Sequence, residues 1–136
     1  MIRGDIYLCD LGQLAGHVQS GYRPVIVIQN NVGNQHSPTI IVCGITSAPK
    51  KQQPTHCFIS TDGGLPKPST VLCEQIFTVN KTDLKHYLGT VSNPRTLNNL
   101  DRCIQISLGL IAEKKDYGKE YHTTQPPKYT RTYKRF

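Results

Sequence analysis

The pattern of apolar and polar positions predicts a chain of short β-strands followed by one helix. The five expected strands cover residues 3–10, 23–29, 39–46, 55–60 and 69–79. The second and third are nearly continuous apolar runs, which are typical of strands buried on both faces, whereas the first alternates. The polar pair Glu74-Gln75 interrupts the fifth strand and predicts a kink there.

The helix is expected over residues 94–111. Ser92 or Asn93 can cap it, and Pro94 suits its first turn. Its apolar positions recur at spacings of three and four, which gives one stripe: Leu97, Leu100, Ile104, Leu108 and Ile111. Residues 80–86 are expected to form a single helical turn. Glycine, proline, asparagine and other polar residues predict loops or turns at 11–22, 30–34, 47–54 and 62–66.

These elements predict a mainly β fold of the α+β class. A set of short strands with one late helix is typical of a small, strongly bent antiparallel β barrel on which the helix packs. A chain of 136 residues is long enough for one domain with a buried core. We expect that domain to cover 1–112, with 113–136 as a tail.

The charge and the cysteines add two expectations. The net charge of +7 favours an anionic partner, either nucleic acid or an acidic protein segment. The five cysteines lie in apolar segments without a Cys-x-x-Cys pair, so they indicate small buried side chains in a reducing compartment. The beginning of the chain lacks the apolar run of a signal peptide, and no segment is long enough to span a bilayer. We therefore expect a cytoplasmic protein without a membrane partner.

The tail has its own composition. Residues 113–136 contain seven Lys/Arg against three Asp/Glu, and four of the seven tyrosines lie there. Cations interleaved with aromatic rings are typical of segments that bind single-stranded RNA. A solubilising tail, or one that folds back on the domain or on a neighbouring subunit, has the same composition, so these interpretations remain open.

Polar residues at strand ends are the candidates for chemistry. Arg23 begins the second strand, and Thr46 and Ser47 end the third. In an antiparallel pair the start of one strand lies beside the end of the other, so Arg23 and Thr46 are expected to be neighbours. The sequence has no phosphate-binding glycine loop, no metal-ligand spacing among its histidines and no nucleophile elbow. Taken alone, each polar residue fits a turn former, a strand cap or a solvated surface position better than it fits a catalytic role.

The order of five segments is the most specific pattern in the chain. They are Arg3–Tyr7, Gly16–Asn30, Ile45–Ser47, Glu74–Ile76 and Ile104–Leu110. In this order and spacing they strongly resemble the MazF/PemK/Kid toxins of bacterial toxin–antitoxin modules. The resemblance covers roughly residues 2–112 and leaves out the tail.

The resemblance implies an SH3-like barrel, a homodimer, and metal-independent, sequence-specific cleavage of single-stranded RNA. It also implies inhibition by a cognate antitoxin and an activity that needs no cofactor. By position, Arg23 and Thr46 match the family's catalytic arginine and threonine, and His17 matches a histidine implicated in the Kid branch. The positions expected to contact RNA are Gln19, Ser47, Lys50, Lys51, Glu74 and Gln75.

Two departures from the family pattern bear on the mechanism. Many members have a glutamate in the first loop where this chain has Val18, so a carboxylate base from that loop is missing. The Kid branch has an arginine before its Cys-Asp-Gln, and this chain has Leu72 there. Glu74 keeps the acidic position.

The residue chemistry assigns the candidates different roles. Without a metal, the 2′-hydroxyl attacks the neighbouring phosphate and leaves a 2′,3′-cyclic phosphate and a 5′-hydroxyl. Arg23 suits the developing phosphoryl charge but not proton abstraction, because a guanidinium has no free lone pair. Thr46 donates a hydroxyl hydrogen bond, and His17, whose side-chain type titrates near neutrality, is the best candidate base.

Two other functions stay open at this stage. A relative of the same fold poisons DNA gyrase by binding, and a barrel of this kind can also bind RNA without cleaving it. The expected pairing of Arg23 with Thr46 favours the nuclease over both.

Overall fold

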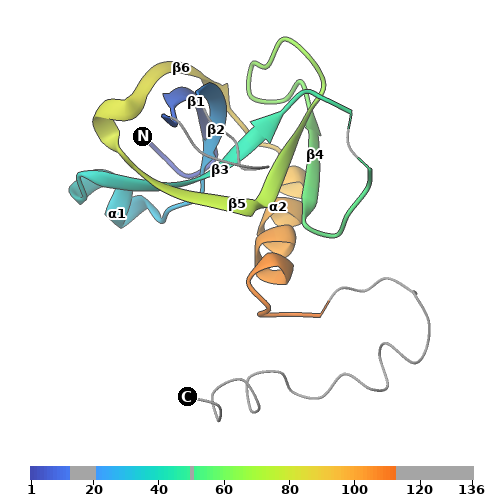
Figure 1. Cartoon of the computed structure of the whole chain (residues 1–136). Coiled ribbons are helices and arrows are strands. Elements are labelled where there is room, and N and C mark those ends of the chain that lie inside the picture. The colour runs from blue at the N-terminus through green and yellow to red at the C-terminus, as the bar shows by residue number, and fades with distance from the viewer. Residues whose placement is uncertain (13–20, 50, 113–136) are drawn as a thin grey trace, which may run out of the picture.

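One strongly bent antiparallel sheet forms most of the molecule (Figure 1). The computed structural model describes residues 1–12, 21–49 and 51–112. Its strands are β1 (Asp5–Asp10), β2 (Tyr22–Val27), β3 (Thr39–Thr46), β4 (His56–Ser60), β5 (Ser69–Asn80) and β6 (Leu84–Thr90), in the order β4-β5-β3-β2-β1-β6. The helices are α1 (Asn31–His36), the 3-10 turn η1 (Lys81–Asp83) and α2 (Pro94–Ser107). This confirms the predicted barrel-like β fold with a late helix, although the sheet ends at β4 and β6 and does not close.

The apolar runs of β2 and β3 are buried on both faces, as their sequence predicted. Val25 and Val27 belong to a cluster on one face of the sheet, and Ile26 belongs to a larger cluster on the other. The larger cluster includes Leu100 and Cys103 of α2, and this helix lies against β4 and β5 (Figure 1). Both faces of the central strands are thus covered within a single chain.

The kink expected in the fifth strand is present as a β-bulge. Along β3 and β5, Cys43 pairs with Ile76, but the next residue, Gly44, pairs with Leu72. Residues 73–75 therefore form an irregular stretch in β5 and bend the strand. The bulge turns the Glu74 side chain outward, where it is exposed.

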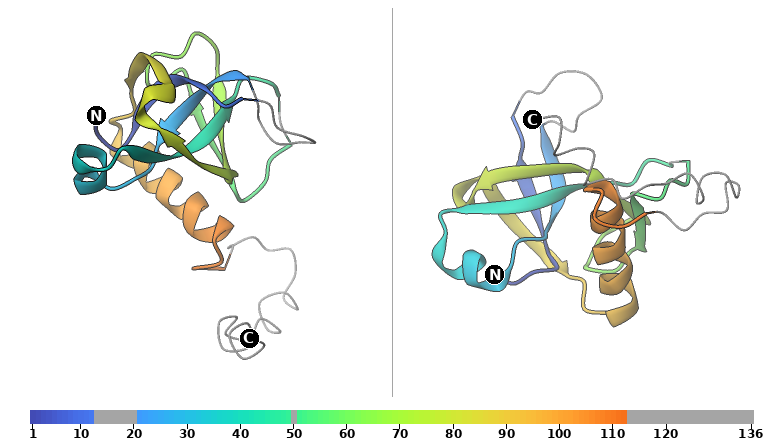
Figure 2. Two further views of the ribbon diagram at one scale, coloured as in Figure 1. Left: turned by 60° about the vertical axis from the view of Figure 1, so that its left-hand side comes forward. Right: turned by 90° about the horizontal axis from the view of Figure 1, so that it is seen from below.

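Two elements differ from the prediction. Residues 30–34 were expected as a turn, but α1 forms because the Asn30 side chain caps it and accepts from the Gly33 N–H at 2.8 Å. In the views of Figure 2 this short helix stands apart from α2, and it contacts β3. The expected turn over 80–86 is confined to η1, and β6 follows it. That strand is half-exposed and lacks an apolar run, so its extended conformation comes from its pairing with β1.

Helix α2 begins where predicted and ends four residues early. Asn93 caps it by accepting from the Arg95 N–H at 2.9 Å. After Ser107 the backbone turns through Gly109 at φ +76°, and the Leu110 N–H donates to the Gln105 carbonyl at 2.8 Å. This is a Schellman-type end, which glycine favours. Within the described residues no helix is long and apolar enough to cross a membrane.

The five cysteines are free and buried, as the sequence predicted. Burial raises the pKa of Cys9 to about 11, and contact with the Cys103 thiol together with burial raises the pKa of Cys57 and of Cys73. The thiolate is the reactive form, so Cys9, Cys57 and Cys73 are neutral at neutral pH, and burial makes all five thiols inaccessible to a reagent in solution.

We therefore expect the native protein to react only slowly with a thiol reagent such as Ellman's reagent at pH 8. Unfolding in guanidinium chloride should release five reactive thiols per chain, because all five are buried in the fold. The measurement is the absorbance trace with and without denaturant. A stoichiometric burst from the native protein would contradict the buried positions.

Candidate functional site

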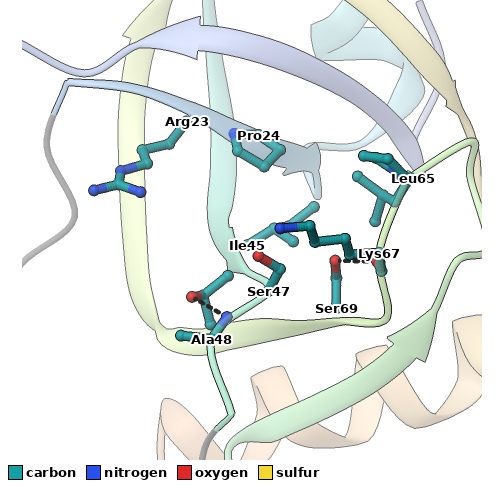
Figure 3. Close-up of a pocket in the computed structure, with 10 residues that line it drawn as sticks. Arg23, Pro24, Ile45, Ser47, Ala48, Leu65, Lys67 and Ser69 are labelled. Atoms are coloured by element: carbon teal, nitrogen blue, oxygen red, sulfur yellow. Dashed lines mark hydrogen bonds between the residues drawn. The ribbon is translucent and has the colours of Figure 1, made fainter.

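A pocket of about 260 Å³ opens where β2 begins and β3 ends (Figure 3). The third side of the pocket is the loop between β4 and β5. Ten of the residues that the structure describes line it: Arg23, Pro24, Ile45, Thr46, Ser47, Ala48, Leu65, Pro66, Lys67 and Ser69. Three of the predicted site residues, Arg23, Thr46 and Ser47, are therefore brought together.

Strand register explains why Arg23 and Thr46 meet. Val25 of β2 pairs with Gly44 of β3 in an antiparallel ladder. Two residues further, toward the start of β2 and the end of β3, the same register sets Arg23 opposite Thr46. On its other side the Arg23 backbone pairs with Cys9 of β1. A cation at the surface thus projects from a strand that is paired with β1, just before β2 joins the ladder with β3.

The Thr46 hydroxyl has a defined orientation. Its Oγ1 accepts from the Ala48 N–H at 3.1 Å, drawn as the dashed line beside Ala48 in Figure 3. Since this contact uses an oxygen lone pair, the hydroxyl hydrogen remains available to donate. Thr46 is half-buried and Ser47 beside it is exposed. The end of β3 therefore presents two hydroxyl groups next to Arg23.

Lys67 is a site residue that the sequence reasoning missed. It lies in the loop before β5, and in Figure 3 its ammonium is directed over the pocket from the side opposite Arg23. Leu65 from the same loop is buried and also lines the pocket. Only the turn composition at 62–66 pointed to this loop, and a turn alone does not reveal which strand end it approaches.

The other predicted RNA contacts lie apart from this pocket. Lys51 lines a second hollow of about 100 Å³ with Phe58 and Thr70. Glu74 accepts from the Thr55 hydroxyl at 3.1 Å and lies 3.2 Å from Nε2 of buried His56. Gln75 is half-buried in the bulge of β5 and lines neither hollow. The predicted set is thus split between two neighbouring places on the sheet.

Three predicted residues cannot be placed. His17, Gln19 and Lys50 lie outside the described residues, as does the tail 113–136. The segment that contains His17 and Gln19 joins β1 to β2, and the two strand ends that flank it, Asp10 and Tyr22, pair with each other beside Arg23. Their predicted roles remain proposals.

The donor set of the pocket fits an anion. The ten lining residues supply a guanidinium, an ammonium and three hydroxyl groups, and none has a carboxylate, an imidazole or a thiol. Hard metal ions prefer oxygen anions, whereas guanidinium and ammonium groups bind phosphate. Over the part of the chain that is described, no three His, Cys, Asp or Glu side chains form a group that could hold a metal ion.

Comparison with known proteins gives consistent results. Residues 2–108 match the family described as PemK-like, MazF-like toxin of type II toxin–antitoxin system. The Endoribonuclease MazF of Staphylococcus saprophyticus is 45% identical over 112 residues, which cover 81% of this chain and 92% of that protein.

Solved structures agree in fold. An endoribonuclease from Mycobacterial species has a TM-score of 0.66 and 27% identity over 80% of this chain and 91% of its own. Another, described as an endoribonuclease in complex with its cognate antitoxin from Mycobacterial species, has a TM-score of 0.68 and 29% identity over 83% of this chain and 99% of its own. With a family match over most of its length and a relative at 45% identity, this chain belongs to the PemK-like, MazF-like toxins of type II toxin–antitoxin systems.

Proposed function

We propose that this protein is a metal-independent endoribonuclease that cleaves single-stranded RNA at specific sequences and is neutralised by a cognate acidic antitoxin. The observation that carries the proposal is the pocket in which the Arg23 strand start faces the Thr46 strand end. The 45% identical relative is named an endoribonuclease, which supports the activity. The antitoxin complex of a structural relative supports the partner, and the net charge of +7 favours an acidic one.

The cleavage chemistry follows from the groups in the pocket. The 2′-hydroxyl loses its proton and attacks the adjacent phosphorus, and the 5′-oxygen leaves and takes up a proton. Arg23 binds two phosphoryl oxygens through its planar fork and stabilises the negative charge of the transition state. Thr46 donates its free hydroxyl hydrogen to the same phosphate. The products are a 2′,3′-cyclic phosphate and a 5′-hydroxyl.

The general base is proposed from the loop between β1 and β2. The family's glutamate position holds Val18, and none of the described residues that line the pocket has a carboxylate. His17 is the proposed base, since an imidazole titrates close to neutral pH. Lys67 adds a second cation that the transition state can use, because its ammonium lies over the same pocket as Arg23.

Contacts around the pocket are proposed to hold the RNA. Lys50 and Lys51 bind backbone phosphates. Gln19, Ser47 and Gln75 are proposed to bond base edges, since unpaired RNA is read on its splayed bases. Glu74 already accepts from Thr55 and lies beside His56, so we assign it to positioning its neighbours.

We further propose a homodimer in the cytoplasm, with residues 1–112 as the toxin domain. Both faces of β2 and β3 are covered within one chain, so burial of these strands does not by itself require a partner. The support is family membership, together with apolar side chains left exposed at the end of α2, Leu108 and Leu110. A monomer by sedimentation at micromolar concentration would argue against the dimer.

Purified protein is expected to cleave a mixed single-stranded RNA in the presence of EDTA. The new 5′ ends should accept phosphate from polynucleotide kinase directly, and the new 3′ ends should resist poly(A) polymerase until the cyclic phosphate is removed. Loss of cleavage in EDTA, or free 3′-hydroxyl ends, would contradict the proposed chemistry. RNA binding without cleavage would support the inactive barrel, and inhibition of gyrase by a protein that leaves RNA intact would support the gyrase poison.

A further inference from the structure

A row of facing residues crosses the sheet from the pocket to its β4 edge. Thr46 of β3 pairs with Thr70 of β5, and Thr70 pairs with Phe58 of β4. Extended to β2, the row begins at Arg23. The adjacent row, Ile45, Val71 and Cys57, is buried in the core. Since successive residues of a strand point to opposite faces, the row from Arg23 to Phe58 lies on the outer face.

Phe58 ends this row as an exposed aromatic ring. Its side chain is 60% exposed, although a phenyl ring at a strand position normally contributes to a core or an interface. With Thr70, Lys51 and Gln52 it lines the hollow of about 100 Å³ described above. The ring therefore has a cation, an amide and a hydroxyl beside it.

The floor of the hollow is held in place. His56 lies two residues before Phe58 on the same face, is buried, and also lines the hollow. Its Nε2 lies 3.2 Å from Glu74 Oε2, and the other Glu74 oxygen accepts from the Thr55 hydroxyl at 3.1 Å. Glu74 is a negative charge near the hollow, and these two contacts engage both of its oxygens.

We propose that Phe58 is a stacking platform for an unpaired base of the RNA substrate, with Lys51 on the backbone of the same nucleotide. Strands lie about 4.8 Å apart, so Phe58 is roughly 10 Å from Thr46 along the row. That separation places the ring beside a nucleotide flanking the phosphate at Arg23 and Thr46. A phenyl face with a neighbouring cation fits a nucleobase and its phosphate, because rings stack on bases while cations track the backbone.

The inference rests on the proposed nuclease function, but the test separates the two. The cleavage site is first mapped on the wild-type protein, and RNA affinity is then measured by fluorescence anisotropy in an Arg23→Ala background. Phe58→Ala should weaken binding by about 5- to 150-fold, since stacking on one aromatic ring has that effect on affinity. Phe58→Tyr should retain affinity, and Phe58→Leu should lose most of it, because only tyrosine keeps the ring face.

An abasic substitution identifies the stacked base. One flanking nucleotide without its base should weaken binding to the Phe58 protein but not to the Phe58→Ala protein. Tyr87→Ala is the matched control, since Tyr87 is an equally exposed ring on β6, at the other edge of the sheet. It should leave RNA affinity unchanged.

Three results would overturn the inference while leaving the nuclease intact. They are wild-type affinity in Phe58→Ala, equal sensitivity to every abasic position in both proteins, and a shift of Phe58→Ala to a smaller oligomer in sedimentation without a change in abasic sensitivity. The last would mean that a second copy of the chain covers the ring. If the wild-type protein cleaves no RNA, the proposed function fails first.

Discussion

Replacing Arg23 by alanine is expected to slow RNA cleavage by about 10²–10³-fold, the effect of removing one preorganised donor from a transition state. Arg23 lies at the surface, at the rim of the pocket. Its loss should therefore change the free energy of unfolding by less than about 0.5 kcal/mol. The measurement is single-turnover cleavage of a mapped RNA, with urea unfolding of the same preparation.

Two further variants separate geometry from charge. Arg23→Lys keeps the charge but loses the planar fork, so it should recover only part of the rate. Arg95→Ala removes an exposed arginine from the first turn of α2, outside the pocket, and should cleave at the wild-type rate. Full activity in Arg23→Ala would move the catalytic centre away from this pocket, and an equal loss in Arg95→Ala would indicate nonspecific electrostatics.

The proximity of Arg23 and Thr46 was predictable from sequence because it depends on local rules. Two apolar runs that follow one another along the chain are expected to pair in antiparallel fashion, and such pairing sets a strand start beside a strand end. The bulge at 73–75 was likewise visible, since a polar pair interrupts an apolar strand. The family pattern then assigned chemistry to positions that residue types alone left ambiguous.

Lys67 and β6 were not predictable for a different reason. Leu84–Thr90 has no apolar periodicity that marks a strand, and its conformation comes from pairing with β1. Lys67 reaches the pocket because the turn before it packs on that same strand. The pattern of apolar side chains along a sequence indicates which residues are buried. The contact between this turn and β6 is made by backbone atoms at glycines, so that pattern does not indicate it.

The loop that delivers Lys67 depends on a close approach between two backbones. Gly64 has φ +82°, and a Cβ there would lie 2.3 Å from the Leu88 carbonyl oxygen of β6. Gly89 faces it, and a Cβ on Gly89 would lie 2.3 Å from the Gly63 carbonyl oxygen. Neither neighbour is a flexible side chain, so the turn has to move if either glycine gains a methyl group. Leu65, Pro66 and Lys67 would move with it.

Gly64→Ala is therefore expected to lower the free energy of unfolding by about 2–5 kcal/mol, from a left-handed backbone conformation combined with steric overlap. Gly109→Ala is the matched control, because Gly109 has φ +76° but nothing within 4 Å of an added Cβ. Gly109→Ala should lower the free energy of unfolding only by the cost of a left-handed backbone conformation for alanine, about 1–2 kcal/mol. Urea unfolding of both variants gives the difference, which measures the overlap alone.

The same pair of variants links this contact to the site. At a temperature where both are folded by circular dichroism, Gly64→Ala should still cleave RNA more slowly than Gly109→Ala, because its loop no longer holds Lys67 and Leu65 at the pocket. Equal stabilities would show that the turn yields freely to the methyl group. Unequal stabilities with equal cleavage rates would mean that the loop between β4 and β5 supports the fold without shaping the pocket in which Arg23 and Thr46 meet.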